Sequence, residues 1–120
     1  MIFEIDFDSD EAFYMQLKNQ IILAIATRAY PEGEVLPSVR KLSEDIGINM
    51  HTVNKAYTVL KDEGFVKVDR RGAVVAVDIN KAEDKRLIID ELKIIIARAT
   101  LKGIKREEMH ALIDAIYDEY

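Results

Sequence analysis

One short stretch of the chain has the side chains that could read the edges of nucleic-acid bases. The segment from Asn49 to Val59 contains no acidic residue, although Asp and Glu outnumber Lys and Arg by 22 to 17 in the whole chain. If its apolar residues form the buried stripe of a helix, the opposite face carries Met50, His51, Asn54, Lys55 and Thr58. Such neutral polar groups suit a DNA major groove, where Asn pairs with adenine and a cation with guanine or phosphate. The alternative is a solvated helix face, which usually carries more Glu and Lys.

Cations on either side of this segment are candidates for the nucleic-acid backbone. Arg40 lies in the first turn of a predicted helix, where a positive charge opposes the helix dipole. A backbone or base contact would compensate for that placement, and a salt bridge to Glu44 is the alternative. Arg70, Arg71 and Gly72 occupy the tip of a predicted hairpin, which could reach phosphates or a minor groove. The alternative is an ordinary soluble turn.

The sequence offers little for catalysis or for a cofactor. Cys is absent and the chain has only two histidines, His51 and His110, so thiolate chemistry and a His-rich zinc site are excluded. Ser38 and Ser43 have no partner His at any motif spacing, and no glycine-rich phosphate loop is present. The acidic residues between positions 6 and 11 are either a hard-cation site or a solvated arm. We therefore predict that the protein is not an enzyme and has no metal or cofactor.

Apolar spacing and turn residues predict the elements that position these side chains. An extended arm over Ile2–Phe7 precedes a helix over about 11–29, capped by Ser9 or Asp10. Two short helices follow, the first beginning after Ser38 and the second capped by Asn49, with Gly47 in the turn between them. Strands over 65–68 and 74–77 then form the hairpin. The order is that of a winged helix-turn-helix over residues 1–77, in a mainly α (α+β) fold.

Residues 78–120 have more apolar surface than one small domain can bury. Asn80–Leu101 is predicted as a helix that is apolar on most sides, Gly103 breaks it, and an amphipathic helix follows up to Tyr120. A helix that is apolar on several sides needs cover on more than one face. We therefore predict a two-helix dimerisation hairpin over residues 78–120. Its predicted interface residues are Leu87, Ile88, Leu92, Ile95, Ile96, Met109, Leu112, Ile113, Ile116 and Tyr117.

Charge and hydropathy bound the remaining possibilities. The chain has 120 residues, 49% of them apolar, and a formal charge of −5. Residues 28–72 carry +1, whereas the segments before and after them carry −4 and −2, so only the middle of the chain is not acidic. Neither a basic secretory signal nor an apolar run of membrane-spanning length is present. We expect a cytoplasmic protein with no membrane partner.

The middle of the chain also carries a connected motif, Leu36-Pro37-Ser38-x-Arg40, then Gly47, then Asn49-x-x-Thr52-Val53-x-x-Ala56-Tyr57. This motif resembles the GntR family of bacterial transcription regulators. The upstream Tyr14-Met-Gln16-Leu and the short helical tail resemble its YtrA subfamily. The chain departs from the family at Met50, where many relatives have Arg. It departs again after Gly72, where the second glycine and the aromatic residue of the family's wing are missing.

The resemblance implies a winged helix-turn-helix that binds double-stranded DNA, and a homodimer formed through the two C-terminal helices. Longer relatives append an effector-binding domain, for which we expect no room after the wing. Family contacts carry over to Arg40, to Asn49, His51, Thr52 and Asn54, and to Arg71 and Gly72. With the groups found above, the predicted DNA-binding residues are Ser38, Arg40, Asn49, Met50, His51, Thr52, Asn54, Lys55, Arg70, Arg71 and Gly72.

Three hypotheses about function follow. The first is a transcription regulator, a repressor, that binds a palindromic operator as a homodimer. The second is an adaptor whose winged helix no longer binds DNA and instead docks a protein; the acidic net charge and Met50 favour it. The third adds an unknown small-molecule effector, for which the sequence names no residue.

Overall fold

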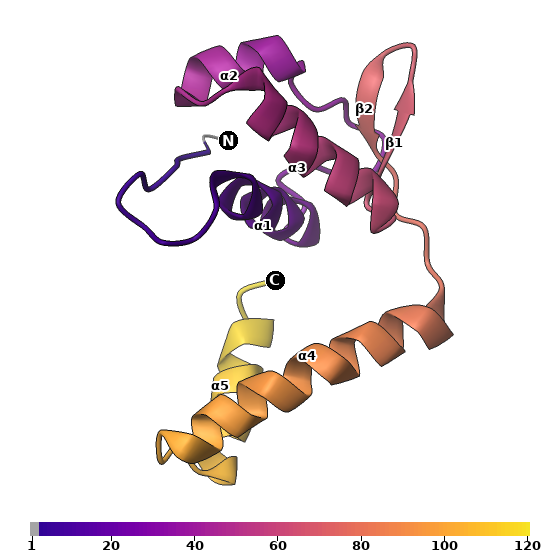
Figure 1. Ribbon diagram of the computed structural model, residues 1–120. Helices are drawn as coiled ribbons and strands as arrows, with labels where there is room; N and C mark the ends of the chain where they lie inside the picture. Colours follow the sequence, from indigo (N-terminus) through magenta and orange to yellow (C-terminus); the bar gives the residue numbers. More distant parts are fainter. Residues whose placement is uncertain (1–2) are drawn as a thin grey trace. The chain divides into compact units, whose positions relative to one another are not determined.

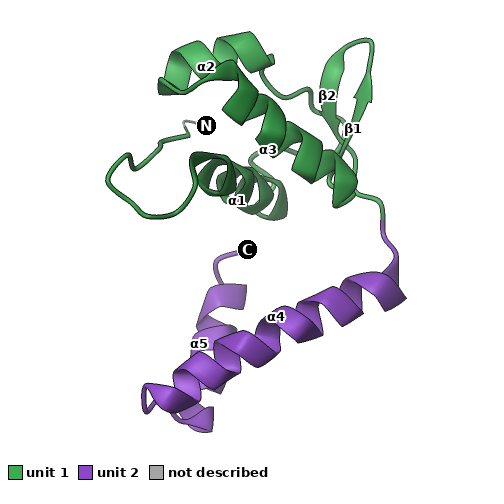
Figure 2. Ribbon diagram, in the orientation of Figure 1, with its two compact units in different colours: residues 1–78 green, residues 79–120 purple. Residues whose placement is uncertain are grey.

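The computed structural model describes residues 3–120. Within the chain, two compact units are separated after Asp78, and the second comprises residues 79–120 (Figure 2). The first unit contains the helices α1 (Phe13–Ala26), α2 (Val39–Ile46) and α3 (Met50–Asp62) and the strands β1 (Val66–Asp69) and β2 (Gly72–Val75). The second contains α4 (Lys81–Leu101) and α5 (Arg106–Tyr117). Five helices and one two-stranded sheet confirm the predicted mainly helical, winged fold (Figure 1).

The core of the first unit forms where α1 packs against α3. Leu17 and Ile21 of α1 and Val53 and Leu60 of α3 have no exposed surface. Each buried aliphatic side chain of this size contributes about 1.5–3 kcal/mol to folding relative to an exposed one. Helix α3 therefore supplies both the centre of the core and, on its other side, a solvent-facing surface.

Helix α1 is shorter than the predicted 11–29, and the cause lies in its end groups. The Ser9 hydroxyl accepts from the Glu11 backbone N–H at 3.1 Å, inside the preceding turn, so the helix begins after Ala12 without a side-chain cap. At the other end, Arg28 takes the left-handed conformation with φ 64°. The Tyr30 N–H then donates to the Ala24 carbonyl at 3.1 Å. This turn ends the helix at Ala26, before Pro31 and Gly33, the residues that we expected to stop the helix.

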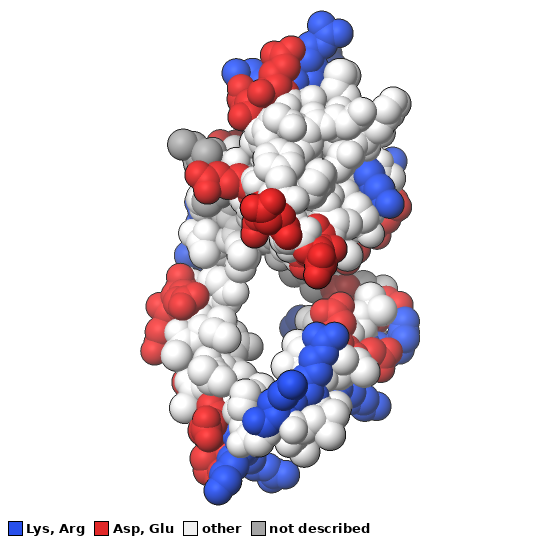
Figure 3. All heavy atoms as spheres, turned by 60° about the vertical axis from the view of Figure 1, so that its left-hand side comes forward, with Lys and Arg blue, Asp and Glu red and all other residues white. Residues whose placement is uncertain are grey.

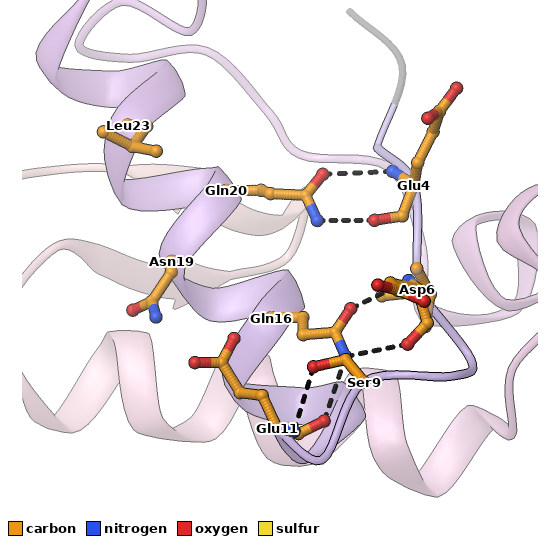
Figure 4. Close-up of a pocket in the computed structure, with 9 residues that line it drawn as sticks. Glu4, Asp6, Ser9, Glu11, Gln16, Asn19, Gln20 and Leu23 are labelled. Carbon is orange, nitrogen blue, oxygen red and sulfur yellow. Dashed lines mark hydrogen bonds between the residues drawn. The ribbon is translucent and has the colours of Figure 1, made fainter.

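The N-terminal segment lies along α1 and is held by two glutamines (Figure 4). The Gln20 side chain donates to the Glu4 carbonyl at 2.6 Å and accepts from the Glu4 N–H at 3.0 Å. Gln16 bonds Asp6 in the same way, at 3.1 Å and 2.9 Å. Each side-chain amide thus bonds the backbone as a neighbouring strand would, so residues 3–6 lie along α1 without belonging to a sheet. The predicted arm ends one residue early, because Phe7 already lies in a turn. Ile2 lies outside the described residues.

The hairpin forms as predicted, but its strands lie closer to the turn. The sequence predicted strands over 65–68 and 74–77, whereas pairing runs from Val66↔Val75 to Asp69↔Gly72. Only Arg70 and Arg71 are left in the turn. Neither has a positive φ, and Gly72 with φ 110° takes the conformation that a side chain would disfavour.

The segment Gly33–Leu36 forms backbone hydrogen bonds with strand β2 of the wing. The Gly33 and Leu36 N–H groups donate to Val75 and Ala73, and the Val75 N–H donates back to Glu34, all at 2.8 Å. This pairing attaches the base of the hairpin to the loop that leads into α2. The wing and the start of α2 therefore hold a fixed position relative to each other.

The second unit is a pair of helices. The Asn80 side chain accepts from the Glu83 N–H at 3.3 Å and caps α4, as predicted for a helix over Asn80–Leu101. Gly103, with φ 78°, turns the chain between α4 and α5. Within this unit Ala99 is the one residue of α4 that is buried, and no residue of α5 is.

The left-handed Arg28 supplies a test of the α1 end. A side chain in this conformation costs about 1 kcal/mol, which glycine avoids. Arg28→Gly is therefore expected to raise the free energy of unfolding by about 0.5–1 kcal/mol in urea denaturation. Arg28→Ala is the matched control because it removes the same side chain but keeps the backbone cost. Equal stability of the two variants would contradict the assignment.

Candidate nucleic-acid interface

Helix α3 presents one polar face to solvent because its other face is filled by the core. Val53, Ala56, Tyr57 and Leu60 are all buried. The side chains opposite them are exposed and define what we call the outer face of α3: Met50, His51, Asn54, Lys55 and Thr58. The predicted separation of a buried stripe from a polar face is therefore present. It carries hydrogen-bonding groups, one thioether and one cation, and no carboxylate.

The turn between α2 and α3 is fixed by local hydrogen bonds. Gly47 has φ 74°, which suits glycine at the end of α2. The Ser43 hydroxyl donates to the Ile48 carbonyl at 2.6 Å across the turn. The Asn49 side chain accepts from the His51 N–H at 2.7 Å and caps α3. The cap uses one lone pair of the Asn49 side-chain oxygen and leaves the NH₂ group free to donate to another partner.

A buried tyrosine connects α3 to the start of α2. Tyr57 is 7% exposed, and its hydroxyl donates to the Pro37 carbonyl at 2.7 Å. Burial raises the pKa of Tyr57 far above the ordinary value of 10, and the nearby Tyr30 adds to this, so the phenol remains a neutral donor. The neighbouring Ser38 accepts from the Lys41 N–H at 3.2 Å and caps α2. The two helices of the helix-turn-helix are thus held at both ends.

Hollows border the outer face of α3. One of about 520 Å³ lies toward α2 and is lined by Val39, Asn49, Met50, His51 and Asn54. Another of about 400 Å³ lies between the start of α2, α3 and the wing. Its lining includes Ser38, Asn54, Thr58, Lys61, Val68, Arg71 and Gly72. The outer face is therefore a ridge between depressions, and Asn54 borders both of them.

The two arginines of the wing tip differ in whether they pair with a carboxylate. Arg71 forms an ion pair with Asp69 at 2.7 Å, and its backbone N–H donates to the same carboxylate at 2.8 Å. The hydrogen bond from Arg71 lowers the pKa of Asp69, and the carboxylate in turn raises the pKa of Arg71. Within residues 3–120, neither Arg70 nor Arg40 forms an ion pair. The alternative considered for Arg40, a salt bridge to Glu44, is absent from residues 3–120, and the neighbouring Lys41 pairs with Asp45 at 3.5 Å.

Seven of the eleven predicted DNA-binding residues line the two hollows that border the outer face of α3, whereas Arg40, Thr52, Lys55 and Arg70 do not. Thr52 and Gly72 are half-buried and the other nine are exposed. Sequence reasoning missed Lys61 and Val68, which help to line the groove beside the wing. It also missed the partner of Lys55, whose ammonium lies 4.1 Å from the ring centroid of Tyr14. That contact joins α3 to α1 over a separation in sequence that no local pattern reveals.

Within the described residues there is neither a candidate metal centre nor a candidate membrane-spanning helix. In residues 3–120, no three His, Asp or Glu side chains are grouped so that they could hold a metal ion. None of the helices in this range is both long and apolar enough to cross a membrane. What the first unit offers is a rigid set of hydrogen-bond donors, acceptors and cations.

The second unit exposes large apolar side chains along both helices. Ile88 is 55%, Ile96 is 51% and Tyr117 is 71% exposed. Of the predicted interface residues, Met109 is half-buried and the other nine are exposed. Figure 3 shows uncharged areas between the charged side chains of this unit. Apolar surface on this scale marks an interaction site in a folded protein.

The chain is similar in sequence to known bacterial regulatory proteins. Residues 13–75 match a family described as "Bacterial regulatory proteins, gntR family". The chain is 30% identical to the uncharacterized HTH-type transcriptional regulator YhcF of Bacillus subtilis over 102 residues, 84% of this chain and 78% of YhcF.

Solved structures extend the similarity over nearly the whole chain. YtrA from Sulfolobus acidocaldarius, a GntR-family transcription factor, is 36% identical, with 96% of each chain covered and a TM-score of 0.61. A transcriptional antiterminator from Listeria monocytogenes is 27% identical, with 98% of this chain and 90% of that one covered and a TM-score of 0.86. The DNA-binding domain of AraR, solved with an operator, is 23% identical, with 61% of this chain and 94% of that one covered and a TM-score of 0.53; it shares the fold.

The buried tyrosine gives a stability prediction. Tyr57→Phe leaves the Pro37 carbonyl without its donor, so it is expected to lower the free energy of unfolding at pH 7 by about 1–2 kcal/mol. Because the pKa of Tyr57 is higher in the folded than in the unfolded state, its contribution is complete below pH 10 and is lost as pH rises beyond that. The difference between wild type and Tyr57→Phe in urea denaturation should therefore shrink between pH 9 and 11.

Tyr117→Phe is the matched control for that experiment, since Tyr117 is 71% exposed. Its stability should follow the wild type at every pH. A difference between wild type and Tyr57→Phe that stays constant up to pH 11 would show that the Tyr57 phenol is not held neutral by the fold.

Proposed function

The chain belongs to the GntR family of bacterial regulatory proteins, and on that premise we propose that it represses transcription as a homodimer bound to a palindromic operator. It is a DNA-binding transcription regulator and not an enzyme. The observation that carries the proposal is the carboxylate-free outer face of α3, held rigidly between hollows. We place its action in the cytoplasm, where the chromosome lies.

In this proposal the outer face of α3 enters the major groove and contacts bases. Asn54 is exposed at its centre and can form the paired hydrogen bonds that select adenine. His51 and the free NH₂ group of Asn49 add donors at the start of the helix. Met50, at 45% exposed, supplies an apolar group that fits a thymine methyl.

The surrounding cations would hold the DNA backbone. Arg40 and Arg70, which have no carboxylate partner in residues 3–120, are free to meet phosphates from α2 and from the wing. Ser38 still has its hydroxyl proton to donate, because only its oxygen lone pair is used in the cap. Arg71 would have to exchange Asp69 for phosphate, so it contributes less than Arg70 to the net attraction.

A second copy of the chain is the partner that we propose for the second unit. Its exposed apolar residues lie on both helices, so a two-fold pair of hairpins would bury them together. Such a dimer presents two α3 helices to half-sites about 34 Å apart, one turn of DNA. The GntR-family transcription factor YtrA is similar over 96% of its length, so the second unit belongs to the part that the two chains share.

One observation favours a different function for the first unit. Exposed Met50 and Val68, at 45% and 61%, and the net charge of −5 suit a surface that binds protein. In that case the winged helix would be an adaptor that no longer recognises DNA. A failure to retain any sequence from a pool of random duplexes at low salt would favour the adaptor.

Base recognition can be tested on a duplex that the protein itself selects from random sequences. Arg40→Ala and Asn54→Ala are each expected to weaken binding by about 1–3 kcal/mol, measured by fluorescence anisotropy at fixed salt. Asn54→Ala should also relax the preference at one base position in a repeated selection, whereas a phosphate contact would not. Arg86→Ala on α4 and Asn19→Ala on the exposed side of α1 are the matched controls. Wild-type affinity in both test variants would refute these assignments.

The homodimer can be tested by light scattering at micromolar concentration. Wild type is expected at twice the chain mass of 13.7 kDa. Ile88→Glu, which puts a charge on an apolar position that is 55% exposed, should shift the mass toward the monomer and weaken operator binding. Ala82→Glu adds the same charge in the first turn of α4, where acidic residues are favoured, and should remain dimeric. A wild-type monomer would contradict the proposal.

A further inference from the structure

Lys55 is the cation of the outer face of α3, and an aromatic ring holds it. Its Nζ lies 4.1 Å from the centroid of the Tyr14 ring, in the first turn of α1. A cation over the face of an aromatic ring is attracted by the ring's negative quadrupole. No carboxylate within residues 3–120 pairs with this ammonium. The Lys55 ammonium is therefore held in position by Tyr14 without being neutralised by a carboxylate.

The space around this pair is open. Phe13, Tyr14, His51, Thr52 and Lys55 line a hollow of about 310 Å³ where α1 meets α3. Among these five lining residues, Lys55 is the one Lys or Arg, and there is no Asp or Glu. The hollow borders the outer face of α3 on the side that faces α1. An anion that approached there would meet one cation and several neutral groups.

The first turn of α1 is itself held in place. The Gln16 amide donates to the Glu11 carbonyl at 2.9 Å and to the Asp6 carbonyl at 3.1 Å, which fixes the chain just before α1. Phe7 packs edge-on against Phe13, with ring centroids 5.2 Å apart. Tyr14 is therefore a fixed support for the flexible lysine.

Attachment of α1 to α3 does not require the contact between Tyr14 and Lys55. Leu17 and Ile21 are fully buried beneath α3, and Lys18 forms an ion pair with Glu63 at 3.5 Å, near the other end of α3. A lysine that only joined the two helices would be expected to find a carboxylate, as Lys18 does. Lys55 has an uncharged support instead, which leaves its charge available.

We propose that Tyr14 is a positioning residue that holds the Lys55 ammonium over its ring for contact with a DNA phosphate, so that the first turn of α1 belongs to the DNA-binding surface. The inference rests on the proposed function, because it needs α3 to lie in the groove. A free lysine loses side-chain freedom when it meets a phosphate, and one held over a ring has less to lose. The ammonium keeps N–H groups directed away from the ring, toward the DNA.

The experiment measures binding to the self-selected duplex by fluorescence anisotropy as a function of salt. Lys55→Met is expected to reduce the steepness of the plot of the logarithm of the binding constant against the logarithm of salt concentration. The reduction should correspond to the loss of about one phosphate contact. Tyr14→Leu should weaken binding about three- to tenfold, in line with the strength of cation–π contacts. Tyr14→Phe, which keeps the ring, should stay within about twofold of wild type. Met15→Leu is the matched control, because it changes the neighbouring side chain of the same turn, which does not line the hollow, and it should keep wild-type affinity.

A double-mutant cycle shows whether Tyr14 affects DNA binding by positioning Lys55 or only by packing within the fold. If Tyr14 acts through Lys55, Tyr14→Leu in the Lys55→Met background should change the affinity less than about twofold. The full three- to tenfold loss in that background would overturn the proposal, since it would show a purely structural role. Loss in Tyr14→Phe equal to that in Tyr14→Leu would also overturn it, because the hydroxyl would then be the contacting group. Thermal melting of each variant confirms that binding is measured on folded protein.

The wild-type arm distinguishes this inference from the proposed function. If wild type selects no duplex, DNA recognition itself has failed. If wild type binds and its salt slope is the same in Lys55→Met, the operator proposal stands and the role of Tyr14 and Lys55 is refuted.

Discussion

The burial of one stripe of α3 is the constraint on which the functional surface depends. Val53 and Leu60 lie about two helical turns apart with no exposed surface, and the Tyr57 hydroxyl between them donates to the Pro37 carbonyl. A rotation of α3 by one residue, about 100°, would bring Asn54 into the apolar core, where its amide would lose hydrogen bonds to water. The core thus selects the rotational position of the helix, and the polar face follows from it.

Features encoded within a few residues could be predicted, and those between distant residues could not. Ser38, Gly47 and Asn49 cap and join α2 and α3 as the sequence indicated, because each acts on a backbone group within four residues. The links from Tyr57 to Pro37 and from Lys55 to Tyr14 have no such local signal, since they arise only when the helices pack. The positions of the site residues were therefore predictable, but not what holds them.

The wing shows how one local interaction changes the meaning of a sequence pattern. Two adjacent arginines suggest two equal phosphate contacts, yet Arg71 is bound to Asp69 and Arg70 is not. The strands also pair up to Gly72, two residues nearer the turn than the run of β-branched residues implied, because glycine takes the positive φ there. Composition alone overstated the basic character of the tip and understated its rigidity.

An acidic protein that binds a polyanion must rely on geometry more than on net attraction. With a formal charge of −5, general attraction to phosphate is weak, and the acidic segments before and after residues 28–72 in the sequence repel DNA. That repulsion favours approach by the carboxylate-free outer face of α3. Because the general attraction is weak, each Lys or Arg that the fold holds beside the DNA contributes a larger share of the binding affinity. In the proposed homodimer, a second copy of α3 would add contacts without adding net positive charge, so affinity would rise mainly where both half-sites fit.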